Sequence, residues 1–448
     1  MAKRLATKFV CNNCGEAFST WTGRCRNCGE CNSLVEQVEV STATAGASGR
    51  QLAVTDLQKA AKSQTKRLTT HLSEIDEVLG GGLVPGSVNL LAGQPGIGKS
   101  TLLLQIAHHI SLTKKVIYIS GEESDRQIAL RAERLGLKSN KLALTIANSA
   151  NDIASTIANG GYEVAVVDSI QAVAVQELSS SAGTVSQITN STQLLSSAAK
   201  STATVLILVG HVTKEGSIAG PKVLEHIVDV VLQLEGDRYG GFKILRSAKN
   251  RYGSTNETAI LEMTDKGLLP VANPSAALLA ERQITDGSVV TAAMEGSRPL
   301  LVEVQALVNP TSYGYPKRTA SGIDINRVNL LIAMLERRTK LKLTDRDIYV
   351  NVVGGIRLTA PAADLAVCMA IGSAAKGLKL AKNAVVFGEV GLSGEVRHVP
   401  FLDKRIAEAK KLGFKTIIGP RAGSQKVPAE YHAASDVRSA LNSFIAKD

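Results

Sequence analysis

The sequence predicts an α/β protein with a parallel sheet in its central part. Three observations predict it: alternating apolar runs and helical stretches, a glycine-rich loop between such a run and a helix, and paired cysteines near the start. Continuous short runs of Val, Ile and Leu are typical of strands buried on both faces. They occur at residues 88–92, 116–119, 164–167 and 205–209. A length of 448 residues fits two or three domains.

The glycine-rich loop follows the first of these runs. It reads Gly93-Gln94-Pro95-Gly96-Ile97-Gly98-Lys99-Ser100, fits G-x-x-x-x-G-K-[ST] at every position, and leads into a helical stretch from Thr101. Glycines let backbone N–H groups surround a phosphate, and the helix N-terminus adds partial positive charge. Residues 93–101 are therefore expected to bind a nucleoside triphosphate. Lys99 would reach the β- and γ-phosphates, and Ser100 would ligate Mg²⁺.

Carboxylates at the ends of two other runs complete this predicted site. Asp168 ends the run 164–167, where a carboxylate would hold Mg²⁺ directly or through water. Glu122 and Glu123 follow the run 116–119, where a carboxylate can orient or deprotonate an attacking water. Either glutamate fits, and Glu122 is preferred.

Five of the six cysteines lie between positions 11 and 31. Cys11, Cys14, Cys25 and Cys28 form two C-x-x-C pairs, which hold four thiolates in tetrahedral reach of one Zn²⁺. Cys31 is a fifth thiol, expected to be a spare neighbour rather than a competing ligand. A segment this short has little core, so the metal is expected to supply most of its folding free energy.

The cysteine pairs, the small polar run after them, the glycine-rich loop and the spacing of the apolar runs divide the chain into four expected parts. They are a zinc finger at residues 1–37, a flexible linker at 38–65, an ATPase domain at 66–272 and a second α/β or α+β domain at 273–448. The runs 230–234, 242–245 and 259–263 are separated by turns, so this edge of the central sheet is expected to be antiparallel.

The net charge of +11 is concentrated in the flanks. Residues 1–70 carry +5, residues 71–270 carry −2, and residues 271–448 carry +8. Basic flanks suit a polyanion such as nucleic acid, although scattered surface charge explains them equally well. No apolar run reaches the length of a membrane span, and the N-terminus has no hydrophobic signal core, so a soluble cytoplasmic protein is expected.

Three features together resemble the bacterial RadA (Sms) family, DNA repair proteins related to RecA. They are the four-cysteine knuckle, the loop at 93–100 paired with the Val164–Ser169 segment, and Lys249-Asn250-Arg251-Tyr252-Gly253. The last resembles the family's KNRFG signature, with tyrosine in place of phenylalanine. The resemblance implies a RecA-like P-loop ATPase core that uses ATP, Mg²⁺ and Zn²⁺.

The resemblance also implies a DNA-dependent ATPase that processes recombination intermediates. It would move along single-stranded DNA and drive branch migration on branched DNA beside the RecA recombinase, which the zinc knuckle would dock. Lys249 and Arg251 would meet the γ-phosphate of a neighbouring subunit or follow the DNA backbone. Residues 179–184 and 211–216 would be DNA-coupling loops, with Lys214 and Lys222 as phosphate contacts.

The final part resembles the proteolytic domain of Lon proteases, which use a serine nucleophile and a lysine. The position that matches the serine is Ala362, and the position that matches the lysine is Asp403. Peptide cleavage through a covalent intermediate needs both a nucleophile and a base, so this mechanism is not expected here. Lys404 would match only after a shift of one residue and would still activate nothing. The domain is expected to be a proteolytically inactive scaffold that assembles a homo-hexamer.

Overall fold

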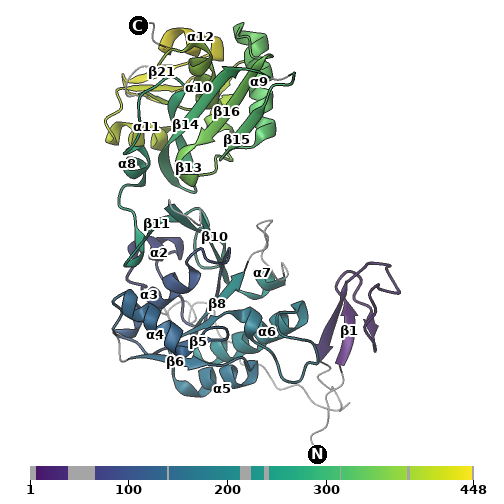
Figure 1. Ribbon diagram of the computed structural model, residues 1–448. Coiled ribbons are helices and arrows are strands. Elements are labelled where there is room, and N and C mark those ends of the chain that lie inside the picture. The colour runs from purple at the N-terminus through teal and green to yellow at the C-terminus, as the bar shows by residue number, and fades with distance from the viewer. Residues whose placement is uncertain are drawn as a thin grey trace, which may run out of the picture. The chain divides into compact units, whose positions relative to one another are not determined.

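The chain forms two compact units in a computed structural model, traced by residue number in Figure 1. The structure describes residues 7–38, 66–138, 141–211, 223–236, 242–312, 314–380 and 384–445. The first unit comprises Met1–Arg238, Lys243–Thr255 and Leu261–Pro270. The second comprises Tyr239–Phe242, Asn256–Ile260 and Val271–Asp448. Most of the predicted linker, together with Lys214 and Lys222, lies outside the described residues.

A small antiparallel sheet opens the first unit. Its strands are β1 (Thr7–Cys11), β2 (Ala17–Phe18) and β3 (Leu34–Val38), in the order β2-β1-β3. Its buried cluster consists of Cys11, Cys25 and Leu34, with two phenylalanines packed against it. A core of this size does not stabilise a fold alone, and a metal held by the cysteines is one source of the missing folding free energy.

A nine-stranded sheet forms the centre of the first unit, in the order β12-β11-β10-β9-β4-β8-β7-β5-β6. Pairings among β4 to β9 are parallel, whereas β10 pairs with β9, and β12 with β11, antiparallel. The predicted parallel sheet with an antiparallel edge is therefore confirmed. The strands are β4 (Val88–Gly93), β5 (Val116–Ser120), β6 (Leu142–Ile146), β7 (Val164–Asp168), β8 (Val205–His211), β9 (Val230–Gly236), β10 (Phe242–Asn250), β11 (Thr258–Thr264) and β12 (Gly267–Pro270).

Helices cover both faces of this sheet. The described helices are α2 (Ser73–Val78), α3 (Lys99–Ser111), α4 (Asp125–Arg134), α5 (Ala150–Gly160), α6 (Val185–Thr202) and α7 (Val223–Ile227). Leu90 of β4 belongs to the core that α5, α6 and α7 close, whereas Leu91 faces the side of α2 and α3. Successive residues of a strand point to opposite faces, so this buried strand lies between two helical layers.

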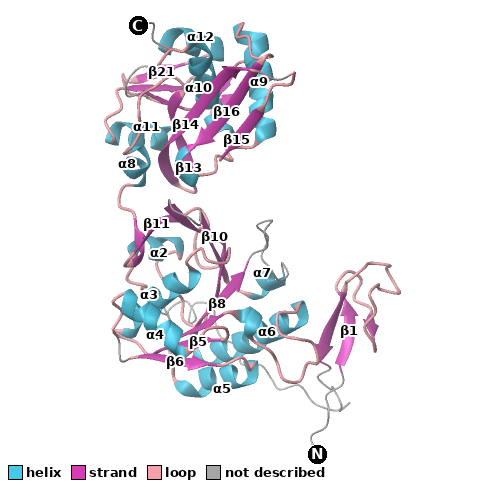
Figure 2. Cartoon of the chain, viewed as in Figure 1, coloured by secondary structure: helices cyan, strands magenta, loops and turns pink. Residues whose placement is uncertain are grey.

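The second unit is built on a seven-stranded mixed sheet in the order β15-β16-β14-β13-β17-β20-β21, drawn in Figure 2. Its strands are β13 (Ser288–Glu295), β14 (Arg298–Pro310), β15 (Arg318–Ser321), β16 (Arg346–Val352), β17 (Ala384–Val386), β20 (Thr416–Gly419) and β21 (Tyr431–Ala433), with a separate hairpin of β18 (Glu389–Val390) and β19 (Val396–Arg397). Its helices are α8 (Pro274–Leu279), α9 (Ile325–Thr339), α10 (Asp364–Lys376), α11 (Leu402–Lys411) and α12 (Val437–Phe444). Within the described residues, no helix combines the length and apolarity that a bilayer crossing requires.

An ion pair between a buried aspartate and a half-buried arginine joins two helices of the second unit. Asp364, at the start of α10, has a side chain that is 2% exposed. It accepts hydrogen bonds from Arg327 of α9, one of them at 3.0 Å from Nε, and from the Val390 N–H at 3.2 Å. Burial raises the pKa of Asp364, and the arginine opposes that effect. The carboxylate therefore depends on Arg327 for compensation of its charge.

Arg327→Ala is expected to lower the free energy of unfolding of the second unit by about 3 kcal/mol, because it leaves a buried carboxylate unpaired. The matched control is Arg397→Ala, which breaks an exposed pair with Glu395 and should cost about 0–1 kcal/mol. Scanning calorimetry on the full chain compares the two transitions. Equal effects from both variants would contradict the structural importance of Asp364.

Candidate functional site

The glycine-rich loop lies at the carboxyl end of β4, the middle strand of the large sheet, and leads directly into α3. Gly98 has φ +116, a backbone conformation that L side chains rarely adopt, so any other residue there would be strained. Lys99 Nζ donates to the carbonyl oxygens of Gly93 at 2.8 Å and Gln94 at 3.1 Å. The ammonium group is thereby folded back over the loop that would surround a phosphate.

Charges from three separate segments meet at this loop. Lys99 is 5% exposed, and burial lowers the pKa of its ammonium group, while Asp168 and Glu122 act in the opposite direction. Parallel strands end at one edge of the sheet, and Ser120 of β5 pairs directly with Asp168 of β7. The structure thus brings together the three charged residues that the sequence predicted for this site, although their roles remain predictions.

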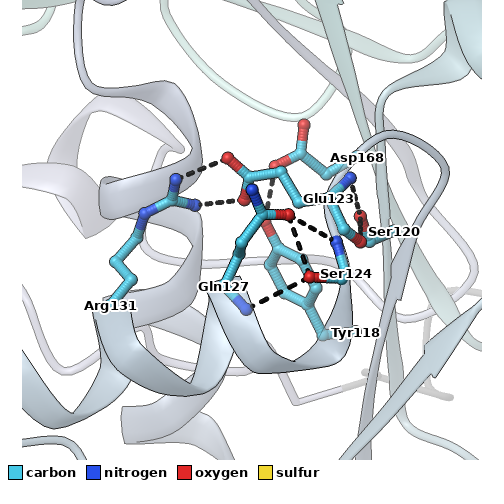
Figure 3. Close-up of polar contacts among 7 residues, drawn as sticks. All are labelled: Tyr118, Ser120, Glu123, Ser124, Gln127, Arg131 and Asp168. Carbon is cyan, nitrogen blue, oxygen red and sulfur yellow. Dashed lines mark hydrogen bonds and ion pairs between the residues drawn. The ribbon is translucent and has the colours of Figure 1, made fainter.

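Asp168 is held by a residue that the sequence motifs do not include. The hydroxyl of Tyr118 donates to Asp168 Oδ2 at 2.5 Å (Figure 3). Burial, with the neighbouring Asp168 carboxylate, raises the pKa of Tyr118 well above its ordinary value. The phenol therefore remains a hydrogen-bond donor at neutral pH.

The two adjacent glutamates after β5 have different partners. Glu123 forms a two-pronged pair with Arg131 of α4, at 2.7 Å and 2.6 Å (Figure 3), and this hydrogen bonding raises the pKa of Arg131. Glu122 is exposed and accepts a hydrogen bond from the hydroxyl of Ser169, next to Asp168. This difference supports Glu122 rather than Glu123 as the residue that contacts water.

The motif Lys249-Asn250-Arg251-Tyr252-Gly253 ends β10 and surrounds Asp229. Lys249 Nζ donates to the carbonyl oxygens of Glu225 and Val228, the latter at 2.7 Å, at the end of α7. Arg251 pairs with Asp229 at 3.0 Å, although its side chain is 53% exposed.

Tyr252 is the position where the motif departs from the signature phenylalanine. Burial and the Asp229 carboxylate raise the pKa of Tyr252, and that carboxylate accepts the tyrosine's hydrogen bond. The extra hydroxyl of this tyrosine therefore has a hydrogen-bond partner, as a partly buried hydroxyl needs.

The register of the sheet separates this motif from the glycine-rich loop of its own chain. Asn250 pairs with Val230, which pairs with Asn89 near the start of β4. Gly93, where the loop begins, lies four residues further along β4, about 13 Å at 3.3 Å per residue. Lys249 and Arg251 therefore lie near the amino end of β4, and the loop lies at its carboxyl end.

The four cysteines predicted as ligands lie together. Cys11 and Cys28 Sγ are 3.6 Å apart, Cys14 and Cys25 Sγ are 3.7 Å apart, and all four sulfurs lie within 4.8 Å of one another. Zn–S bonds of about 2.3 Å in a tetrahedron give sulfur separations of about 3.8 Å, so this donor set fits Zn²⁺. Cys31 is exposed and is not in the cluster.

Other predicted residues fall outside this geometry. The loop at 212–216, Lys214 and Lys222 are not among the described residues. The loop 179–184 leads into α6, and Ser179 donates to Glu36 of the small sheet at 3.2 Å. In the second unit, Ala362 is buried and Asp403 is exposed on α11.

Known proteins resemble each part of the chain and the whole. Family models match residues 9–36 (rubredoxin metal binding domain), 55–217 (AAA domain) and 324–423 (subunit ChlI of Mg-chelatase). The crystal structure of the RadB recombinase covers 46% of this chain and 99% of its own, with 24% identity and a TM-score of 0.37.

Relatives named DNA repair protein RadA match over almost the full length. The Listeria monocytogenes protein is 47% identical, with coverage of 96% of this chain and 95% of its own. The Aquifex aeolicus protein is 46% identical, covering 97% and 98%, and the Pseudomonas aeruginosa protein is 45% identical, covering 95% and 94%. The predicted fold class is confirmed: a zinc knuckle, a RecA-like P-loop core and a Lon-protease-like domain. The chain belongs to the RadA family of DNA repair proteins.

Proposed function

We propose that this chain is a DNA-dependent ATPase that moves along single-stranded DNA and promotes branch migration of RecA-mediated strand exchange. The observation that supports it most is the meeting of Lys99, Asp168 and Glu122 at the carboxyl edge of the parallel sheet. One ammonium and two carboxylates beside a glycine-rich loop match the needs of phosphoryl transfer to water. Membership of a DNA repair family supplies the substrate class.

Each residue has a distinct role in this proposal. Lys99 neutralises phosphate charge, and Ser100, the second residue of α3, ligates Mg²⁺ together with Asp168. The ion, when bound, supplies charge stabilisation on the phosphate oxygens. Glu122 orients the attacking water, because Glu123 is engaged by Arg131.

Lys249 and Arg251 are proposed to act on the nucleotide of a neighbouring subunit. They lie toward the sheet edge opposite their own loop, and Arg251 is accessible. A cation supplied by another subunit can stabilise the transition-state charge. A homo-hexameric ring, in which each protomer meets the next head to tail, satisfies that requirement.

DNA contacts are proposed for the loop 179–184, for Lys214 and Lys222, and for the basic C-terminal part. Branched DNA and the RecA recombinase are the proposed partners, with RecA docked by the zinc knuckle. Peptidase activity is not proposed, because Ala362 lacks a nucleophilic atom. Lys404 donates to the carbonyl oxygen of Ser297 at 3.1 Å.

Single-stranded DNA is expected to stimulate ATP hydrolysis, and a plot of the logarithm of DNA affinity against the logarithm of salt concentration should fall linearly.

Lys99→Ala should reduce hydrolysis at least about 100-fold, because the phosphate charge loses its counterion. The control Lys114→Ala removes an exposed lysine paired with Glu163 and should leave hydrolysis unchanged. A turnover rate indifferent to DNA, in protein that retains no oligonucleotide, would refute the proposal.

Mixing two inactive variants tests action between subunits. Lys99→Ala has a defective nucleotide site but an intact Arg251. Arg251→Ala has an intact nucleotide site but lacks the arginine that would act on the neighbouring subunit. An equal mixture should recover up to about a quarter of wild-type hydrolysis, because one interface in four joins an intact loop to an intact arginine. Replacing the first partner with the Lys99→Ala/Arg251→Ala double variant should abolish recovery. Absence of recovery in exchanging oligomers would instead favour a DNA or structural role.

Cys14→Ser is expected to reduce bound zinc from about one ion per chain to nearly none, because a structural site needs four ligands. Cys31→Ser, the matched control, should retain the ion. Metal analysis measures both, and the fluorescence of Trp21, the single tryptophan, reports unfolding of the small sheet on chelation. Loss of zinc from Cys31→Ser to the same extent would place Cys31 among the ligands.

A further inference from the structure

Tyr118 is a buried polar side chain in the middle of an apolar strand. It lies between Ile117 and Ile119 in β5 and is 1% exposed. A buried hydroxyl needs a hydrogen-bond partner, and this one donates to Asp168 Oδ2 at 2.5 Å (Figure 3). Phenylalanine would fill nearly the same space without making this contact.

The sheet register explains why this tyrosine reaches that carboxylate. Ser120 pairs with Asp168, and Tyr118 pairs with Val166, two residues earlier on both strands. Residues two apart on a strand share a face, so Tyr118 is the diagonal neighbour of Asp168. An aromatic side chain with a terminal hydroxyl is long enough to span such a diagonal.

We propose that Tyr118 is a positioning residue for the metal ion of the nucleotide site. Its hydroxyl holds Oδ2 of Asp168 and leaves Oδ1 as the oxygen offered to Mg²⁺. The inference rests on the proposed role of Asp168 as a metal ligand. Hydrogen bonds from a hydroxyl to a carboxylate are short and strong, and outer partners of this kind orient metal ligands.

The surrounding contacts keep the strand end and the following loop in place. Ser120 Oγ donates to the Glu123 carbonyl oxygen at 2.8 Å and accepts from the Glu123 N–H at 2.9 Å. Arg131 of α4 forms an ion pair with the Glu123 carboxylate. The arginine also interacts electrostatically with Tyr118 and Asp168. The tyrosine therefore belongs to a rigid support on the side of Asp168 that faces α4 (Figure 3).

Tyr118→Phe tests the inference. With ADP bound, the affinity for Mn²⁺, measured by electron paramagnetic resonance, should weaken about tenfold. The Mg²⁺ concentration for half-maximal ATP hydrolysis should rise by a similar factor, and kcat at saturating Mg²⁺ should stay within about twofold of wild type. Affinity for ADP in the presence of a chelator should not change.

Tyr162→Phe is the matched control. Tyr162 lies in the same unit and packs beneath Lys115, so both metal measurements should stay at their wild-type values. If Tyr118→Phe does not fold, Tyr118→Met, which also lacks a donor and adapts to irregular space, takes its place. The melting temperature, measured separately, identifies a merely structural effect.

Asp168→Asn separates the two levels of the proposal. If it loses metal affinity while Tyr118→Phe keeps or gains affinity, the positioning role of Tyr118 is overturned and Asp168 remains the ligand. If Asp168→Asn also binds Mn²⁺ normally, the proposed ligand itself is wrong. Tenfold weakening in Tyr118→Phe and a larger loss in Asp168→Asn support both.

Discussion

Parallel pairing of β4, β8, β7 and β5 is the constraint on which the nucleotide site depends. Strands that run in one direction bring their carboxyl ends to one edge, so the glycine-rich loop, Asp168 and the Glu122 loop meet although they are far apart in sequence. Most side chains along these strands are apolar and buried on both faces, and the charged residues of the site lie where the strands end. A shift of β7 by one residue would turn the Asp168 side chain to the other face of the sheet.

The opposite edge of the same sheet is organised around Asp229. Its carboxylate accepts hydrogen bonds from the Val88 N–H at 3.0 Å and from the Tyr252 hydroxyl, and forms an ion pair with Arg251. Its backbone N–H donates to the Val88 carbonyl oxygen at 2.9 Å. The first residue of the central strand is thereby tied to the KNRYG motif. β4 therefore runs from this motif at its first residue to the glycine-rich loop at its other end.

The sequence was sufficient for features carried by local patterns and insufficient for contacts made across strands. The strand–loop–helix, the four-cysteine cluster and the alternation of strands and helices depend on residues close together in the chain, and all were predicted. Tyr118 was missed because a tyrosine in an apolar run reads as core, and only the pairing of β5 with β7 shows that it meets Asp168. Asp229 was also missed, because its partners are distant in sequence: Arg251 lies 22 residues after it and Val88 lies 141 residues before it.

The second unit places a buried charge next to a well-packed apolar cluster. At the position matched to a serine nucleophile, Ala362 is buried in an apolar cluster, so the site is packed and not vacant. Two residues further along the chain, the buried carboxylate of Asp364 is unfavourable because it has lost its hydration. Arg327, from a different helix, forms an ion pair with it. Such a pair contributes little net stability compared with apolar packing, but it fixes how α9 and α10 meet.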